Sequence, residues 1–400
     1  MATPLSSAAR KAVTREEMVE RARALVPGLR ARAAETEKSR RIHPETHREL
    51  TDSGLYRVLS PRRFGGFDLD YGLLIDISAE LGRGCASTAW VWAQLVAHNL
   101  CNAMLPPEGQ EEYWAGGEDA AAASASPNPG ATTRKVAGGY VLDGSWGFAS
   151  GVDVCQWNIF LCFVARDGGG PPVTVFCLAP ERDYTVVDDW FPVGLAGTGS
   201  KRIDVREVFV PDHRTMNIEH CRGGPTAGSA INPGPLSKIS VLAAGSKLFS
   251  GPAIGAARGA LDAVTGEFKS RKSVGGVNLA GQQSVQMRIA HAEAEIDAAW
   301  TILRRDCDQA MDFAGRSAEP PLELRLRWRR NDAYALNLCI AAVDRLFPLT
   351  GGRGLAASSA FQRAWRDCHA CGQQIMVNWD LMMTQFGRHM LDQPILDPRM

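Results

Sequence analysis

Two stretches near the middle of the chain, Trp157-Asn-Ile-Phe-Leu-Cys-Phe-Val164 and Val173-Thr-Val-Phe-Cys-Leu178, are rich in β-branched and aromatic residues. The turn signal Asp167-Gly168 separates them, and further runs of this kind lie at Tyr140–Leu142 and Ile203–Val210. Short runs of this composition that are bounded by turn residues predict paired β-strands. The sequence therefore predicts an antiparallel β domain in the middle of the chain.

Helical patterns lie on both sides of this β domain. Thr14 and Glu17 have the spacing of a helix capping box, and apolar residues follow them at helical intervals. The helical period returns after the β domain, most clearly in the run that begins at Val285. Further helices are expected at residues 73–81, 87–105, 331–346 and 361–386. We expect three domains: an N-terminal helical domain (1–119), a central β domain with a following loop (120–235) and a C-terminal helical bundle (236–400).

The composition argues against several classes of function. The 400 residues include 44 Lys and Arg and 44 Asp and Glu, and no basic stripe stands out, so neither a nucleic acid nor an anionic membrane is an expected partner. The first 18 residues lack the apolar segment of a signal peptide, and no uncharged apolar stretch is long enough for a membrane span. The ten cysteines show no disulfide spacing, so we expect a soluble, cytoplasmic protein with reduced thiols.

Several segments of the chain, in their order and spacing, carry a resemblance to a known family. They are Gly54–Pro61 with Phe64–Gly66, Cys85–Trp90, Trp146–Gly151, Val193–Ser200, Val205–Pro211 and Gln362–Asp367. Together they resemble the acyl-CoA dehydrogenase superfamily, and in particular its flavin-dependent monooxygenase branch, the oxygenases for 4-hydroxyphenylacetate and for steroid-ring phenols. The resemblance covers nearly the whole chain. It implies an α+β fold with an N-terminal helical domain, a central antiparallel β-barrel and a C-terminal four-helix bundle, assembled as a homotetramer.

The resemblance also implies a function. The chain is expected to be the oxygenase component of a two-component flavin-dependent monooxygenase, which hydroxylates a phenolic, polycyclic or indole-like ring through a C4a-hydroperoxyflavin. The implied cofactors are O2 and reduced FMN or FAD. The segment Gly194–Gly199 does not have the G-x-G-x-x-G spacing of a dinucleotide site, and no helix is expected after it. A separate NAD(P)H-dependent flavin reductase is therefore expected to supply the reduced flavin.

Residues in the matching segments, and a few outside them, are candidates for contact with the flavin. A flat isoalloxazine ring needs an apolar wall and a few hydrogen-bonding groups at its edge. Without the family context, Trp146 would be a core residue beside a turn, Thr198 and Ser200 part of a glycine-rich hairpin, and Arg271 the solvated end of a helix. The resemblance implies Ser150 as a hydrogen-bond donor near flavin N5 and Arg271 near the flavin phosphate. The full set of candidates is Trp90, Ser124, Ser126, Trp146, Phe148, Ser150, Thr198, Ser200 and Arg271.

Three polar residues are candidates for the reaction or the substrate pocket. A lone histidine on an apolar helix, such as His98, is more often a satisfied core residue, but the resemblance implies an active-site role for it. His369 is retained from a C-terminal pattern of two histidines, and Gln374 stands where the second would be. Gln cannot take a proton at neutral pH, so either His98 acts as the base or the ring needs none. We expect a pocket walled by Trp90, His98 and Gln374, with His98, Ser150 and His369 as catalytic candidates.

Other functions stay open at this level. Most acyl-CoA dehydrogenases use a Glu that follows an Arg-Asp pair similar to Arg366-Asp367, but no carboxylate occurs between Asp367 and Asp380. The alternatives are an acyl-CoA dehydrogenase with its base elsewhere, an N-oxygenase on the same scaffold and a non-catalytic flavin-binding protein. No metal site is expected, because His43–His47 has Pro44 between its histidines and Cys368–Cys371 has no second cysteine pair.

Overall fold

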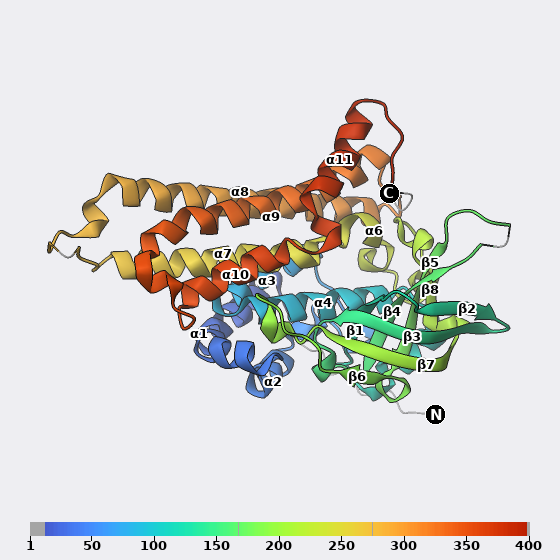
Figure 1. Ribbon diagram of the computed structural model, residues 1–400. Helices are drawn as coiled ribbons and strands as arrows, with labels where there is room; N and C mark the ends of the chain where they lie inside the picture. The colour runs from blue at the N-terminus through green and yellow to red at the C-terminus, as the bar shows by residue number, and fades with distance from the viewer. Residues whose placement is uncertain (1–12, 167, 274, 398–400) are drawn as a thin grey trace.

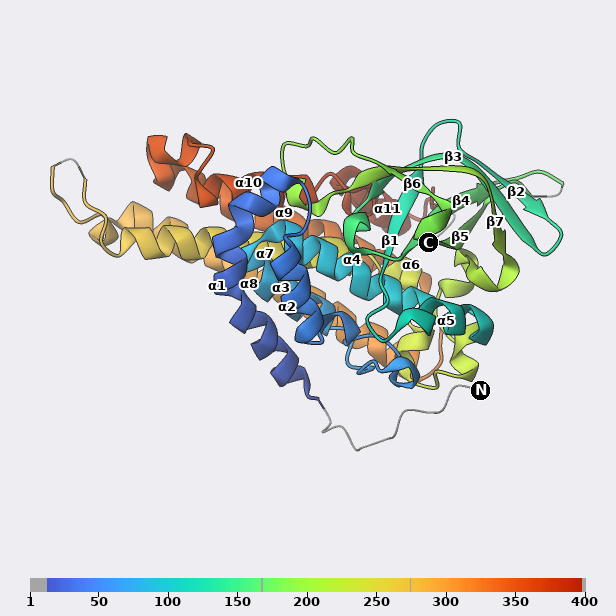
Figure 2. The same cartoon turned by 90° about the horizontal axis from the view of Figure 1, so that it is seen from below.

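The computed structural model describes residues 13–166, 168–273 and 275–397 of the chain. Asp167 of the expected Asp167-Gly168 turn, and most of the N-terminal segment considered above, lie outside the described residues. Helices come first, then a β-sheet and then more helices, which confirms the predicted order of elements. The sheet lies at one end of an elongated body of helices (Figures 1 and 2).

The N-terminal part contains the helices α1 (Arg15–Ser39), α2 (Pro44–Asp52), α3 (Leu73–Gly84), α4 (Ala86–Asn102) and α5 (Pro107–Tyr113). The predicted cap is confirmed, because the hydroxyl of Thr14 accepts a hydrogen bond from the backbone N–H of Glu17. Every residue of α4 is buried, since other helices and the sheet surround it. A helix that is apolar on all sides is suited to such a position, and α4 carries Trp90 and His98 into the interior.

The sheet consists of eight strands within the described residues. They are β1 (Ala122–Pro127), β2 (Thr132–Val136), β3 (Gly139–Ala149), β4 (Trp157–Val164), β5 (Val173–Pro180), β6 (Thr185–Val187), β7 (Lys201–Pro211) and β8 (Thr215–Asn217). Their order across the sheet is β6-β7-β3-β1-β4-β5-β8, with β2 paired to β3. β1 and β4 run parallel, with Ser124 opposite Ile159, and the other strand pairs are antiparallel.

The prediction of an antiparallel β-barrel is therefore wrong in two respects. After β1 the chain runs through the β2–β3 hairpin and returns alongside β1, so β4 lies parallel to β1. The two strands at the ends of the sheet, β6 and β8, have three residues each and do not pair with each other, so the sheet stays open among the described residues. Short end strands expose few unpaired backbone groups, which limits the pairing that closure would need.

The C-terminal part is a bundle of the long helices α7 (Lys247–Phe268), α8 (Gln283–Gly315), α9 (Leu322–Thr350) and the shorter α10 (Ala360–Cys371), with α6 (Val241–Ala244) before it and α11 (Trp379–Met390) after it. The predicted apolar face of α8 is confirmed, because Val285, Ile296 and Leu303 are buried. The helical segment expected at 361–386 is divided into α10 and α11 by the 3₁₀ turn Ile375–Val377. In Figures 1 and 2 the connection between α7 and α8 lies at the end of the bundle that is remote from the sheet.

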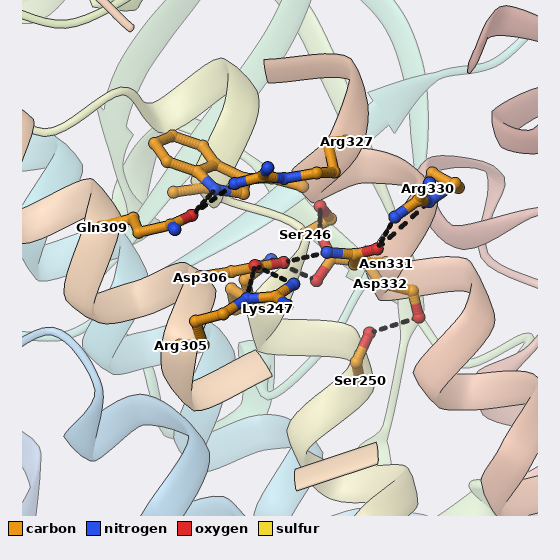
Figure 3. A network of polar contacts seen from close by, with 12 residues as sticks. Ser246, Lys247, Ser250, Arg305, Asp306, Gln309, Arg327, Arg330, Asn331 and Asp332 are labelled. Atoms are coloured by element: carbon orange, nitrogen blue, oxygen red, sulfur yellow. Dashed lines mark hydrogen bonds and ion pairs between the residues drawn. The ribbon is translucent and has the colours of Figure 1, made fainter. Parts of the chain in front are cut away.

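A buried ionic network joins the start of α7 to α8 and α9 (Figure 3). Nζ of Lys247 lies 2.5 Å from Oδ1 of Asp332, and the hydroxyl of Ser246 donates to the other oxygen of this carboxylate. On α8, Asp306 accepts a hydrogen bond from Nδ2 of Asn331 at 2.7 Å. Lys247, Asp306 and Asp332 are all 0% exposed, so each of these charges depends on its partners. The network therefore sets how the start of α7 packs against the rest of the bundle.

Two further predictions can be compared with the described residues. All ten cysteines are buried and free of disulfides, as expected from their spacing. None of the described helices has both the length and the apolar character required to cross a bilayer.

Candidate active site

An interior cavity of about 180 Å³ lies between α4, the sheet and the start of α7. Its wall is mostly apolar, and the polar side chains in it come from elements far apart in the sequence. The apolar part of the wall includes Leu100, Ile159, Leu161, Phe176, Ile218, Ile239, Leu242, Leu248, Phe249 and Met376. A mostly apolar cavity with a few convergent polar groups is the usual form of a small-molecule site.

His98 enters this cavity from α4 as a neutral imidazole. Its Nδ1 lies 2.7 Å from the backbone carbonyl oxygen of Ala122 at the start of β1. A carbonyl oxygen can only accept, so Nδ1 carries the proton and Nε2 is left as an acceptor. Burial lowers the pKa of His98 to about 4, which keeps the ring uncharged at neutral pH. The site therefore contains one histidine nitrogen that can accept a proton from a bound molecule.

Three other predicted residues line the same cavity. Ser124 and Ser126 are two positions apart on β1, so their side chains point to the same face of the strand. Gln374 approaches from the segment between α10 and α11, where its side-chain oxygen accepts from the backbone N–H of Met376. The structure thus brings Gln374 and His98 to one cavity, although Gln374 itself can offer only hydrogen bonds.

A chain of hydroxyl groups lies next to the cavity wall. The indole Nε1 of Trp90 donates to Oγ of Ser150 at 3.1 Å, and Oγ of Ser150 lies 2.7 Å from Oγ of Ser200. Oγ of Ser200 lies 2.7 Å from Oγ1 of Thr198, which donates to the carbonyl oxygen of Leu195 at 2.8 Å. Trp90 does not itself line the cavity; its ring packs against that of Phe249, which does, at a centroid distance of 5.2 Å. Four of the predicted flavin residues are therefore connected to one another.

The loop that carries Thr198 and Ser200 is held by α10. The backbone N–H of Leu195 donates to Oδ1 of Asp367 at 2.7 Å, and burial raises the pKa of this carboxyl to about 6. Leu195 has a φ of +54°, a left-handed conformation that is unfavourable for a residue with a side chain. Contacts from α10 thus hold this loop in a strained backbone conformation.

Trp146 and Phe148 lie on β3 but in different surroundings. Trp146 is 0% exposed, its indole N–H donates to the carbonyl oxygen of Leu161 at 2.9 Å, and its ring meets the edge of Phe160, so it packs in the core of the sheet. Phe148 is 66% exposed and has a φ of +65°, and its ring contacts that of Trp190 edge to face. An exposed aromatic side chain on a strained backbone therefore stands two residues before Ser150.

Arg271 and His369 lie apart from this site within the described chain. Arg271 belongs to the connection between α7 and α8, and this connection lies at the end of the bundle remote from the sheet (Figure 1). Its Nη1 donates to the carbonyl oxygen of Leu349 at 2.9 Å. His369 is on α10, with Nε2 2.9 Å from Oδ1 of Asp344, and it is not part of the cavity wall. The chain alone does not bring these two predicted residues to the cavity.

Sequence reasoning missed five polar residues of the cavity wall, namely Tyr71, Gln94, Thr174, Arg329 and Asp397. The hydroxyl of Tyr71 donates to the carbonyl oxygen of Ala244 at 2.8 Å, and Nη1 of Arg329 donates to that of Leu242 at 3.0 Å. Burial also raises the pKa of Tyr71 well above its usual range. No local signal marks these residues, since Arg329 lies in a run of basic residues that is typical of a solvated helix face.

Comparisons with known proteins identify related chains. Residues 14–114 match the family model described as acyl-CoA dehydrogenase, N-terminal domain, and residues 247–379 match that of the acyl-CoA dehydrogenase C-terminal domain. The chain is 36% identical over 374 residues to the FADH(2)-dependent resorcinol hydroxylase, oxygenase component, of Rhizobium sp. (strain MTP-10005), with 91% of each chain covered. It is 29% identical to the p-hydroxyphenylacetate 3-hydroxylase, oxygenase component, of Acinetobacter baumannii, with 94% of this chain and 89% of the relative covered.

Solved structures give the same result. The 3-HSA hydroxylase from Rhodococcus sp. RHA1 has a TM-score of 0.90 and 32% identity, with 96% of this chain and 99% of that chain covered. XiaF from Streptomyces sp., in complex with FADH2 and glycerol, has a TM-score of 0.87 and 27% identity, with 96% and 97% covered. The chain therefore belongs to the acyl-CoA dehydrogenase superfamily and, within it, to the flavin-dependent monooxygenases, as an oxygenase component.

Proposed function

We propose that the protein hydroxylates a small phenolic ring bound in the cavity beside His98, with reduced flavin and O2 as co-substrates. The observation that carries this proposal is the neutral imidazole of His98 in a mostly apolar wall, with Nε2 left as a proton acceptor. A phenol becomes a better nucleophile toward an oxygen donor as its hydroxyl loses the proton, so an acceptor at this place is useful. The names of two relatives, hydroxylases of resorcinol and of p-hydroxyphenylacetate, support the substrate class.

The remaining polar residues of the wall would orient the ring. Ser124 and Ser126 offer hydroxyls on one face of β1. Gln374 offers its amide group from the segment between α10 and α11. We assign the base to His98 rather than to His369, because His369 bonds to Asp344 and does not line the cavity. Since Gln374 takes no proton, a polycyclic or indole-like ring that needs no second base is also compatible with these wall residues.

The flavin would lie beside Ser150, next to the cavity rather than inside it. The exposed ring of Phe148 offers an apolar surface for a flat ring, and the positive φ of Phe148 is a strain that such a contact would explain. When bound, the reduced flavin supplies the two electrons that activate O2. Within the chain, Ser150 would meet the polar edge of the ring, while Trp90, Thr198 and Ser200 would hold Ser150 in place from behind. Trp146 would support this strand from the core of the sheet.

The remaining parts of the proposal concern partners. Arg271 lies at the end of the bundle remote from the sheet, so it would meet a flavin phosphate only on a neighbouring subunit of a homotetramer. FMN and FAD both carry such a phosphate. We also propose a separate NAD(P)H-dependent reductase as the source of reduced flavin, a cytoplasmic location, and domains that span residues 1–119, 120–235 and 236–400.

The test is a single-turnover reaction. The purified protein is mixed anaerobically with FADH2 or FMNH2 and with resorcinol or 4-hydroxyphenylacetate as probes, and is then exposed to O2. We expect a hydroxylated product, with hydrogen peroxide as a minor product. Complete conversion of the reducing equivalents to peroxide with every phenol tried would contradict the proposal. Anaerobic reduction of the oxidised flavin by an acyl thioester would favour a dehydrogenase instead.

A further inference from the structure

The hydrogen-bond chain beside the cavity allows its protons to be placed one by one. A hydroxyl group has one proton to donate, a carbonyl oxygen can only accept, and an indole N–H can only donate. Thr198 Oγ1 lies 2.8 Å from the carbonyl oxygen of Leu195, so the proton of Thr198 is used in this contact. Thr198 then has no proton left for Ser200, 2.7 Å away, and Ser200 must be the donor in that pair.

The same reasoning extends to Ser150. Because the proton of Ser200 points to Thr198, the 2.7 Å contact between Ser150 and Ser200 requires Ser150 to donate. At the other end, Trp90 Nε1 donates to Ser150 at 3.1 Å, which agrees with this direction. All the protons therefore run one way, from Trp90 through Ser150, Ser200 and Thr198 to the carbonyl oxygen of Leu195. The proton of Ser150 points away from any ligand, and the oxygen has one lone pair left to offer.

The opposite direction is disfavoured by the surroundings of Leu195. If Thr198 donated to Ser200, two oxygen atoms would face each other at 2.8 Å without a proton between them. The carbonyl group of Leu195 cannot easily turn aside, because its own residue is held at a φ of +54° with its N–H on Asp367. It also accepts from the indole N–H of Trp190 at 3.2 Å. Several contacts thus fix the acceptor that sets the direction of the chain.

We propose that Thr198 and Ser200 are positioning residues that make Ser150 a hydrogen-bond acceptor and thereby favour reduced over oxidised flavin. This inference rests on the proposed contact between Ser150 and flavin N5. N5 of a reduced flavin carries a hydrogen, which the lone pair of Ser150 accepts, whereas N5 of an oxidised flavin has only a lone pair and needs a donor. The donor role expected for Ser150 from the sequence is thereby reversed. An oxygenase that receives flavin from a separate reductase gains from such a preference, since oxidised flavin would otherwise occupy the site.

The test compares the dissociation constants of oxidised and reduced flavin in the full-length protein. Oxidised flavin is titrated by fluorescence quenching, and reduced flavin by anaerobic equilibrium dialysis, so no turnover is needed. The wild type should bind reduced flavin more tightly. In Ser200→Ala, Ser150 loses its acceptor, and in Thr198→Val, Ser200 is free to donate to Ser150. Both changes release the proton of Ser150, so oxidised flavin should bind about fivefold more tightly, which is the factor for about 1 kcal/mol from one hydrogen bond.

Two further variants separate this inference from the proposed function. Thr198→Ser keeps the hydroxyl and should retain the wild-type ratio of dissociation constants, which excludes a purely structural effect of Thr198→Val. Ser150→Ala should weaken binding of reduced flavin. If Ser150→Ala weakens it while Ser200→Ala and Thr198→Val leave the affinity for oxidised flavin unchanged or lower, the proton direction is wrong but the flavin contact stands. If Ser150→Ala changes neither constant, Ser150 does not meet the flavin, and both ideas are overturned.

Discussion

The substitution His98→Asn tests the proposed base directly. Asn has a polar side chain that fits the buried position, but none of its atoms takes up a proton at neutral pH. General bases commonly contribute a factor of about 10² to 10⁴ to a reaction rate. We therefore expect hydroxylation of a phenol at pH 7 to fall by at least about 10²-fold, with the reducing equivalents appearing as hydrogen peroxide instead.

The structure also indicates how His98 would act. Burial lowers the pKa of His98 to about 4, while an ordinary phenol has a pKa of about 10. Complete proton transfer between the free groups would thus cost about 8 kcal/mol. His98 is therefore expected to accept a hydrogen bond in the ground state and to take the proton only as the ring is attacked. Because its pKa lies far below 7, the wild-type rate should not depend on this residue between about pH 5 and pH 9.

The assay measures hydroxylated product and peroxide for each O2 consumed, at pH 6 to pH 9. The rate of the His98→Asn variant should recover as the pH approaches the pKa of the phenol, because the substrate then ionises without help. A matched control is His369→Asn, the same change at a histidine that bonds to Asp344 and does not line the cavity, for which we expect less than about a twofold change. Wild-type rate and coupling in His98→Asn at pH 7 would refute the assignment.

Two further predictions concern stability. Burial raises the pKa of Asp367 to about 6, above the value of an unfolded Asp, so its contribution to stability is complete below about pH 4 and is lost as the pH rises through about 6. In thermal melts from pH 4 to pH 8, the melting temperature of Asp367→Asn should therefore rise relative to that of the wild type. Parallel curves for the two proteins would contradict the raised pKa. Lys247→Met leaves Asp332 buried without its ammonium partner and should lower the free energy of urea unfolding by about 3–5 kcal/mol. Adding Asp332→Leu to this variant should recover much of the loss, because no unpaired charge is then buried. An equal loss in the single and the double variant would show that the ion pair is not the cause.

The order of elements could be predicted because it depends on local patterns. The run from Ser87 onward predicted a largely apolar helix, and the structure shows α4 there with every residue buried. The turn-bounded runs at 157–164 and 173–178 predicted strands, and both are found as β4 and β5. The parallel pairing of β1 with β4 could not be predicted in this way, because it depends on the path of the chain through the β2–β3 hairpin. Closure of the sheet likewise depends on whether β6 and β8 can meet.

Some of the candidate residues named from the sequence lie together in the structure. His98, Ser124, Ser126 and Gln374 do line one cavity. The wall residues Tyr71 and Arg329 carry no local signal, since they reach the cavity only through the packing of the turn before α3 and of α9.

By itself, the sequence determined the alternation of helices and strands, the buried character of α4 and the residues available for chemistry. These properties follow from periodicity and composition, which act over a few neighbouring residues. The tertiary structure decided which nitrogen of His98 bears the proton and in which direction the hydroxyl chain from Trp90 to Leu195 points. The first depends on the carbonyl group of Ala122, and the second on the carbonyl group of Leu195. Ala122 is distant from His98 in the chain, and Leu195 is distant from Trp90. Hydrogen-bond direction is therefore a property of the packed molecule, because a hydroxyl or an imidazole has no preferred donor direction until its acceptor is in place.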